Sequence, residues 1–215
     1  MRNIKPIKVI TPVILLLLGV SLMAIEEAKF RTIQKDGPFE LRQYEKYLLA
    51  ETIIAGDMED ASSRAFRRLF NYISGENRSQ SKVAMTAPVS QQAAGQKISM
   101  TTPVSQEPME DAWGISFMIP NTFTEETVPI PNDDRVKIRV VPGRQMATIQ
   151  YSGRWSRAQF MKNKHKLEEW IQSEGLIVTG EAIWARFNAP YTPWFMRRNE
   201  VQIPVIRPEV QPEQG

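Results

Sequence analysis

Hydrophobic and polar residues alternate along two neighbouring segments near the start of the chain. Residues 39–44 alternate with a period of two, and residues 47–55 follow as a run rich in Leu, Ile and Thr that ends at Gly56. Both patterns are typical of strands. Apolar residues then recur with a helical period up to Gly75, where a helix is expected to end; they are Ala61, Ala65, Phe66, Leu69, Phe70, Tyr72 and Ile73. We therefore predict two strands followed by a helix.

The second half of the chain repeats this order. Residues 136–141 and 145–151 have strand patterns, and residues 156–174 have a helical pattern that ends at Gly175. The apolar side of this second helix is formed by Phe160, Leu167, Trp170 and Ile171. Four shorter segments complete the predicted strands, namely residues 82–85, 97–100, 114–119 and 182–187.

The two halves can be superimposed at one constant offset along the sequence. The matched pairs are Leu41/Ile138, Ala50/Ala147 and Gly56/Gly153 and, after a shift of one residue, Leu69/Leu167, Tyr72/Trp170 and Ile73/Ile171. Few identities survive, so the repeat is one of pattern. Two such units are expected to merge their strands into one curved surface. The predicted fold class is therefore α+β, in which a duplicated strand–helix–strand unit forms a distorted antiparallel barrel or sheet with two flanking helices.

The first 24 residues have the pattern of a targeting segment. Arg2, Lys5 and Lys8 precede an uncharged run over residues 9–25. A basic start followed by a short apolar stretch is typical of a secretory signal peptide. An uncleaved membrane anchor has a similar pattern, although the run is shorter than the roughly 20 residues that a spanning helix prefers. Both alternatives predict an exported or membrane-anchored domain, which would be periplasmic or membrane-facing in a bacterium.

Charge and composition exclude several classes of site. Without its targeting segment the chain has equal numbers of basic and acidic residues, because three of the 27 basic residues lie there and 24 acidic residues lie elsewhere. Nucleic-acid binding needs a surplus of positive charge, so no nucleic-acid partner is expected. The absence of cysteine excludes disulfides and thiolate metal sites. His165 is the single histidine, and its neighbours Lys164 and Lys166 predict that it faces solvent.

Several short motifs occur in a fixed order along the chain. Two similar pentapeptides, residues 85–89 and 100–104, each end in a Pro-Val pair and predict adjacent strands that finish in a bend. With the other motifs they resemble the SOUL haem-binding family. Those motifs are Phe39-Glu40-Leu41-Arg42 with Tyr44; Phe66, Leu69, Phe70 and Tyr72-Ile73-Ser74-Gly75 with Asn77; Lys82 to Val89; Met118-Ile119-Pro120; Tyr151-Ser152-Gly153; and Tyr191 to Trp194 with Arg197 to Val201. The resemblance covers residues 27–204 and leaves residues 205–215 as a predicted flexible tail.

The resemblance implies reversible, non-catalytic binding of haem or a related tetrapyrrole by a carrier, buffer or scavenger. A porphyrin is a flat apolar plate with two carboxylates, so its site needs an apolar wall and cations at the rim. The resemblance places the ring against the first helix, where Arg64, Arg67 or Arg68 would pair with the propionates. These arginines could equally form an ordinary solvated helix face.

Two further sets of residues could contact the tetrapyrrole. Phe66 and Phe70 lie at the edge of the apolar stripe and could contact the ring, although the core is the favoured place for them. The iron ligand stays open between Met85, Met100, a tyrosine and none from the protein, and the metal site is unknown. His165 does not match the position of the axial histidine that some family members use.

An alternative function is a small-molecule hydrolase or an effector-sensing domain on the same duplicated fold. Glu200 follows Arg197 and Arg198, and Tyr191 is close in sequence, so these residues could form a titrating cluster. The favoured alternative is structural, with Glu200 pairing with an arginine at a strand end. The hydrolase hypothesis requires Glu200 and Tyr191 to meet in one pocket. No motif of phosphate-binding or metal-binding spacing accompanies them, and no catalytic residue is predicted.

Overall fold

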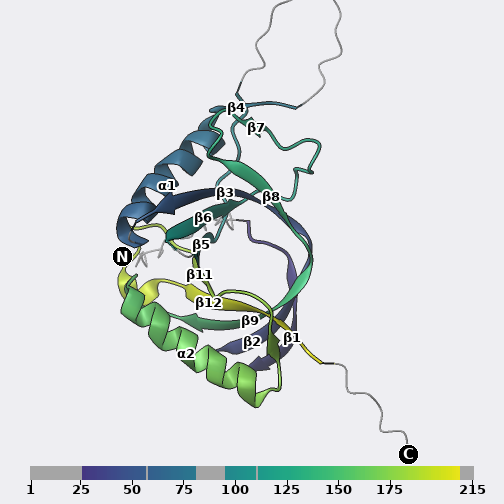
Figure 1. Cartoon of the computed structure of the whole chain (residues 1–215), viewed down its shortest axis with the longest axis vertical. Helices are drawn as coiled ribbons and strands as arrows, with labels where there is room; N and C mark the ends of the chain where they lie inside the picture. The colour runs from purple at the N-terminus through teal and green to yellow at the C-terminus, as the bar shows by residue number, and fades with distance from the viewer. Residues whose placement is uncertain (1–25, 57, 81–94, 110, 209–215) are drawn as a thin grey trace, which may run out of the picture.

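A computed structural model of the chain describes residues 26–56, 58–80, 95–109 and 111–208 (Figure 1). Within these residues, ten strands form one antiparallel sheet in the order β1-β2-β9-β12-β11-β5-β6-β3-β8, with β10 paired to β12, and β4 pairs with β7. The elements are β1 (Phe30–Asp36), β2 (Phe39–Tyr44), β3 (Tyr47–Ala55), α1 (Met58–Ser74), β4 (Asn77–Arg78), β5 (Val104–Pro108), β6 (Ala112–Met118), β7 (Ile130–Pro131), β8 (Lys137–Val141), β9 (Arg144–Tyr151), α2 (Arg157–Ser173), β10 (Ile177–Val178), β11 (Ile183–Arg186), the 3-10 helix η1 (Trp194–Met196) and β12 (Asn199–Ile206).

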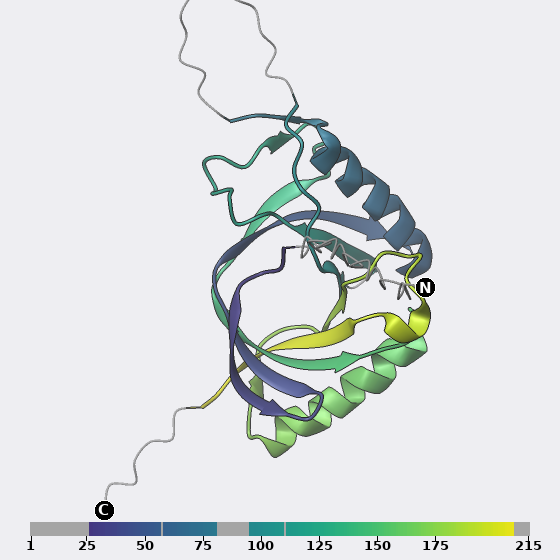
Figure 2. The same cartoon turned by 180° about the vertical axis from the view of Figure 1, so that it is seen from behind.

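The sheet curls into a half-barrel, and both helices lie against its outer face (Figures 1 and 2). This arrangement confirms the predicted α+β fold with two flanking helices. The register also follows the internal repeat, because Leu41 pairs with Ala147 while its repeat partner Ile138 pairs with Ala50. Strands of one half therefore pair with strands of the other: β2 with β9, β3 with β8, and β5 with β11.

Alternation along each strand divides the buried residues between the two faces of the sheet. On the outer face, Leu69 and Tyr72 of α1 pack into one apolar cluster, and Leu167 and Trp170 of α2 pack into another. On the inner face, a smaller cluster fills part of the half-barrel. It comprises Ala28, Tyr44, Leu49, Met118, Val141, Met146 and Ile183. The helices are thus held by apolar burial, and the inner face has room for polar side chains.

The structure corrects two of the predicted segments. Residues 97–100 do not form a strand; this segment runs beside the end of α1, where the backbone N–H of Ile98 donates to the carbonyl of Ile73 at 2.8 Å. The predicted tail begins too early, because β12 continues to Ile206. The expectations for residues 1–24, for the strand at 82–85 and for Met85 lie outside the described residues. Within the described residues, neither helix combines the length and apolar character needed to cross a membrane.

Candidate functional site

A cleft lies between α1 and the segment that follows β11. Its volume is about 620 Å³. Helix α1 contributes one wall, and residues around β9 and β11 contribute the other. The cleft is lined by Ser62, Ser63, Phe66, Arg67, Phe70, Val104, Trp155, Arg186, Asn188 and Pro190.

Two phenylalanines of α1 form the apolar wall of the cleft. Phe66 and Phe70 are one helical turn apart, and their rings stack at 6.1 Å with an interplanar angle of 12°. The Phe66 ring also meets Phe117 of β6 edge-on at 5.3 Å, which fixes it against the sheet. The two side chains are nevertheless 37% and 46% exposed, so the favoured expectation that they belong to the core is wrong. Exposed aromatic surface in a cleft is typical of a ligand-binding site.

Two arginines stand at the same cleft. Arg67 follows Phe66 on the exposed side of α1. Arg186 of β11 is half-buried, and its guanidinium lies over the rings of Trp184 at 4.1 Å and Trp155 at 5.0 Å. Such stacking holds a cation in place beside an apolar surface. Sequence analysis missed Arg186 and Trp155, because only the folded sheet brings β11 and the start of α2 beside α1.

The other two predicted arginines do not reach the cleft. Arg64 donates to the backbone carbonyl of Ala55 at 2.9 Å. Arg68 donates to the hydroxyl of Thr52 at 2.6 Å and forms an ion pair with Asp133 at 3.6 Å. Positions 64 and 68 are one turn apart and both reach the backbone or side chains of β3, whereas Arg67 lines the cleft. Arg64 and Arg68 therefore hold the helix against the sheet.

His165 does not line this cleft. It is on α2, its side chain is 75% exposed, and its Nε2 is 3.2 Å from a carboxylate oxygen of Glu169. The expected solvent exposure is confirmed. Among the described residues that line the cleft there is no histidine, methionine or tyrosine.

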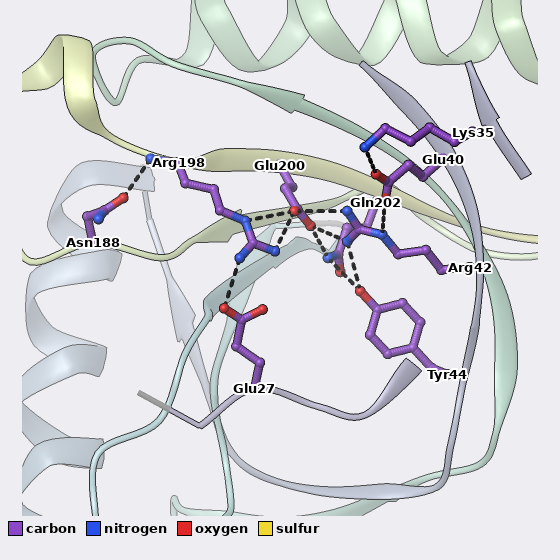
Figure 3. Close-up of polar contacts among 9 residues, drawn as sticks. All are labelled: Glu27, Lys35, Glu40, Arg42, Tyr44, Asn188, Arg198, Glu200 and Gln202. Carbon is purple, nitrogen blue, oxygen red and sulfur yellow. Dashed lines mark hydrogen bonds and ion pairs between the residues drawn. The ribbon is translucent and has the colours of Figure 1, made fainter. Parts of the chain in front are cut away.

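A second polar arrangement occupies the inner face of the half-barrel (Figure 3). Glu200 of β12 is fully buried. Arg42 of β2 donates to its two carboxylate oxygens at 2.9 and 3.2 Å. Arg198 donates twice to Oε1, at 3.0 and 2.8 Å, and the amide of Gln202 donates to Oε2 at 2.8 Å. Two guanidinium groups thus compensate the charge of one buried carboxylate.

This arrangement links three parts of the chain. Arg198 also pairs with Glu27 at 2.8 Å, and Arg42 with Glu40 at 2.7 Å. Burial opposes the charge of Arg42, but the attraction and hydrogen bonds of Glu200 outweigh it and raise the pKa of the guanidinium above its usual value. Tyr191, in contrast, is 90% exposed on a surface loop. Glu200 and Tyr191 do not meet in one pocket, so the specific hydrolase pairing is wrong.

Comparison with protein families shows which family this chain belongs to. The family described as SOUL heme-binding protein matches residues 25–204. The chain belongs to this family. Among its relatives, the SOUL chain is 26% identical over 170 residues to Heme-binding protein 1 of Xenopus tropicalis, a match that covers 78% of this chain and 84% of that protein.

Solved structures share the fold of the SOUL chain at low sequence identity. The C-terminal domain of EcmrR is 12% identical with a TM-score of 0.52, and the match covers 79% of this chain and 97% of that domain. A hydrolase from Listeria innocua is 15% identical with a TM-score of 0.52, over 81% of this chain and 94% of its own. At these identities the likeness extends to the fold alone.

The buried phenol of Tyr44 gives the SOUL domain a measurable dependence on alkaline pH. Burial raises the pKa of Tyr44 from 10.0 to about 12, and Glu200 adds to the effect. The folded state keeps this proton up to about pH 12 whereas the unfolded chain loses it near 10, so stability from this group is complete below pH 10 and is lost as the pH rises towards 12.

Substituting Tyr44 with phenylalanine should therefore change the pH profile of unfolding. At pH 8 we expect the variant to be less stable by about 1 kcal/mol, because Arg42 and Gln202 each lose a hydrogen-bond acceptor. Between pH 10 and 12 the wild type should lose more stability than the variant, by up to about 2–3 kcal/mol for a two-unit shift. Urea unfolding at several pH values measures both. Parallel profiles for the two proteins would contradict the assignment.

Proposed function

We propose that the cleft beside α1 binds haem or a related tetrapyrrole reversibly and without catalysing a reaction on it. The observation that carries the proposal is the exposed pair Phe66 and Phe70, stacked on each other along the wall of a cleft of about 620 Å³. Stacked aromatic side chains offer an apolar surface to a planar ring. Family membership supports the same ligand class.

Charge in the cleft supports a ligand with carboxylates. Arg67 and Arg186 line the cleft, and no acidic residue is among its described lining residues. A propionate can accept hydrogen bonds from a guanidinium in a paired geometry. With no histidine, methionine or tyrosine in the described lining, the ring itself and its propionates would supply the recognition, which suits a carrier that later releases its ligand.

The groove beside α2 provides an internal comparison. It has a volume of about 600 Å³ and occupies the place that the internal repeat assigns to the α1 cleft in the other half. At the matched helix positions, Ser63 corresponds to Met161 and Phe66 to Lys164. This groove has acidic lining residues, Asp111 and Glu181, besides its cations. The stacked phenylalanine pair and the purely basic charge are therefore specific to the α1 side.

Haemin titration of the full chain tests the proposal. We expect a saturable change in the Soret band, and the double variant Phe66→Ser/Phe70→Ser should raise the Kd by about 10- to 100-fold. Arg67→Ala should raise it by about two- to fivefold, as for a partly exposed ion pair. Metal-free protoporphyrin should bind within about threefold of haemin, because no described lining residue ligates iron.

The matched control is Met161→Ser on α2. Met161 is 47% exposed and lines the corresponding groove, so this variant removes exposed apolar surface from the α2 side and should leave the Kd unchanged. No saturable Soret shift in the wild type, or equal weakening by Met161→Ser and by the phenylalanine variant, would disprove binding at the α1 cleft.

A further inference from the structure

A short loop beside the α1 cleft exposes aromatic side chains to solvent. It comprises residues 190–196, includes η1, and is called the aromatic loop below. Tyr191 is 90% exposed, Trp194 50%, Phe195 61% and Met196 65%. Leaving adjacent large apolar side chains in water is unfavourable, and contiguous surfaces of this kind mark interaction sites.

The loop is held firmly in this conformation. Arg197 donates to the carbonyls of Thr192 at 2.8 Å and Pro190 at 2.6 Å, and its guanidinium lies over the ring of Trp155 at 4.2 Å. The backbone N–H of Gly153 donates to the carbonyl of Trp194 at 3.1 Å. The exposed side chains therefore project from a fixed support.

Positive charge is concentrated around the loop. Residues 151–158 and 186–198 together contain five arginines and no acidic residue, although the chain beyond its first 24 residues is neutral. Arg154 lies over the ring of Trp194 at 5.8 Å, and both line a hollow together with Trp155 and with Pro190 of the loop. Aromatic side chains next to arginines match the interface of a bilayer, where apolar acyl chains lie beneath anionic headgroups.

The chain enters the folded domain beside this loop. Glu27 forms its ion pair with Arg198, which is two residues beyond η1 (Figure 3). The uncharged run of the sequence, residues 9–25, ends two residues before Glu27. Any membrane attachment through that run would bring the bilayer to the same side of the domain as the aromatic loop.

We propose that the aromatic loop seats the domain on an anionic bilayer surface. Trp194, Phe195 and Met196 lie in the interfacial layer, and Arg154 and Arg157 contact the lipid headgroups. Because Trp155 and Pro190 line both the hollow of the loop and the α1 cleft, the cleft opens next to the lipid. The docking does not depend on which ligand the cleft takes.

Quenching by brominated lipid tests the docking in the full chain. The protein is reconstituted into vesicles of phosphatidylcholine and phosphatidylglycerol, with and without brominated acyl chains, and tryptophan fluorescence is compared with that of the Trp194→Phe variant. We expect bromine-dependent quenching of the wild type, most of which is lost in Trp194→Phe. Phe195→Ser/Met196→Ser should reduce the quenching by at least about twofold, because these side chains hold the loop at the interface.

The matched control is Ile177→Ser/Val178→Ser. Both residues are 50% exposed and lie on β10, which pairs with the end of β12 remote from Arg198, so quenching should not change. Equal quenching in wild type and Trp194→Phe would overturn the proposal. So would equal shielding of Trp194 from aqueous acrylamide in detergent and in vesicles, because the loop would then be covered by protein.

Discussion

Replacing Glu200 with alanine will lower the free energy of unfolding by about 3–5 kcal/mol. The carboxylate is fully buried, and its partner Arg42 is 3% exposed. Removing the carboxylate leaves the Arg42 guanidinium on the inner face of the half-barrel, where Glu40 is its one remaining charged partner among the residues that the structure describes. An uncompensated buried charge is among the most destabilising changes that a single substitution produces. Urea unfolding of the full chain, followed by tryptophan fluorescence, measures the loss.

A solvent-exposed ion pair is the control for this substitution. Glu168 pairs with Lys164 at 2.6 Å on α2 and is 43% exposed, so Glu168→Ala should change stability by less than about 0.5 kcal/mol. Glu200→Gln should cost less than Glu200→Ala, because the amide oxygen still accepts one hydrogen bond. A loss below about 1 kcal/mol for Glu200→Ala would show that the arginines are solvated without it.

Substitutions of Leu69 and Leu167 with alanine should each cost about 3 kcal/mol. The two leucines occupy matched positions of the internal repeat, and both are fully buried between a helix and the outer face of the sheet. Each substitution removes apolar contacts and leaves a cavity under one helix. Thermal and urea unfolding measure the losses.

The Kd for haemin is expected to distinguish Leu69→Ala from Leu167→Ala. Leu69 supports the helix that carries Phe66 and Phe70, so Leu69→Ala should also weaken haemin binding under conditions where the protein remains folded. Leu167→Ala should leave the Kd unchanged. The reverse pattern, with Leu167→Ala alone weakening haemin, would place the ligand at α2 instead.

The sequence predicted the fold well where apolar side chains dominate the buried positions. Strands β2 and β3 and helix α2 follow from alternation, an apolar run and helical spacing, because their apolar side chains pack into the clusters on either face of the sheet. Strand β12 was missed because Glu200 and Gln202 point to the polar inner face and Pro204 interrupts the pattern, while Val201 and Ile203 pack under α2. Prediction from hydrophobic alternation assumes that the buried positions of a strand are apolar, whereas β12 buries a charged side chain on the inner face of the sheet.

Only the α1 wall of the cleft could be predicted from the sequence. Helical spacing places Phe66, Phe70 and Arg67 on α1 but does not separate the flank of Arg67 from that of Arg64 and Arg68, whose partners are Ala55 and Thr52. The opposite wall of the cleft comes from residues more than 80 positions further along the chain, from Trp155 onwards. Only the tertiary fold brings those residues to the helix.

The pairing of strands between the two halves affects how the protein folds during its synthesis. Consecutive strands β2 and β3 pair with β9 and β8, about 100 residues later, and β12 pairs with β9, β10 and β11. Contacts between residues so distant in sequence slow folding. A nascent chain that has emerged only as far as α1 has unpaired strand edges. The domain can complete its sheet only after Ile206 has left the ribosome, so neither half of the repeat is an independent folding unit.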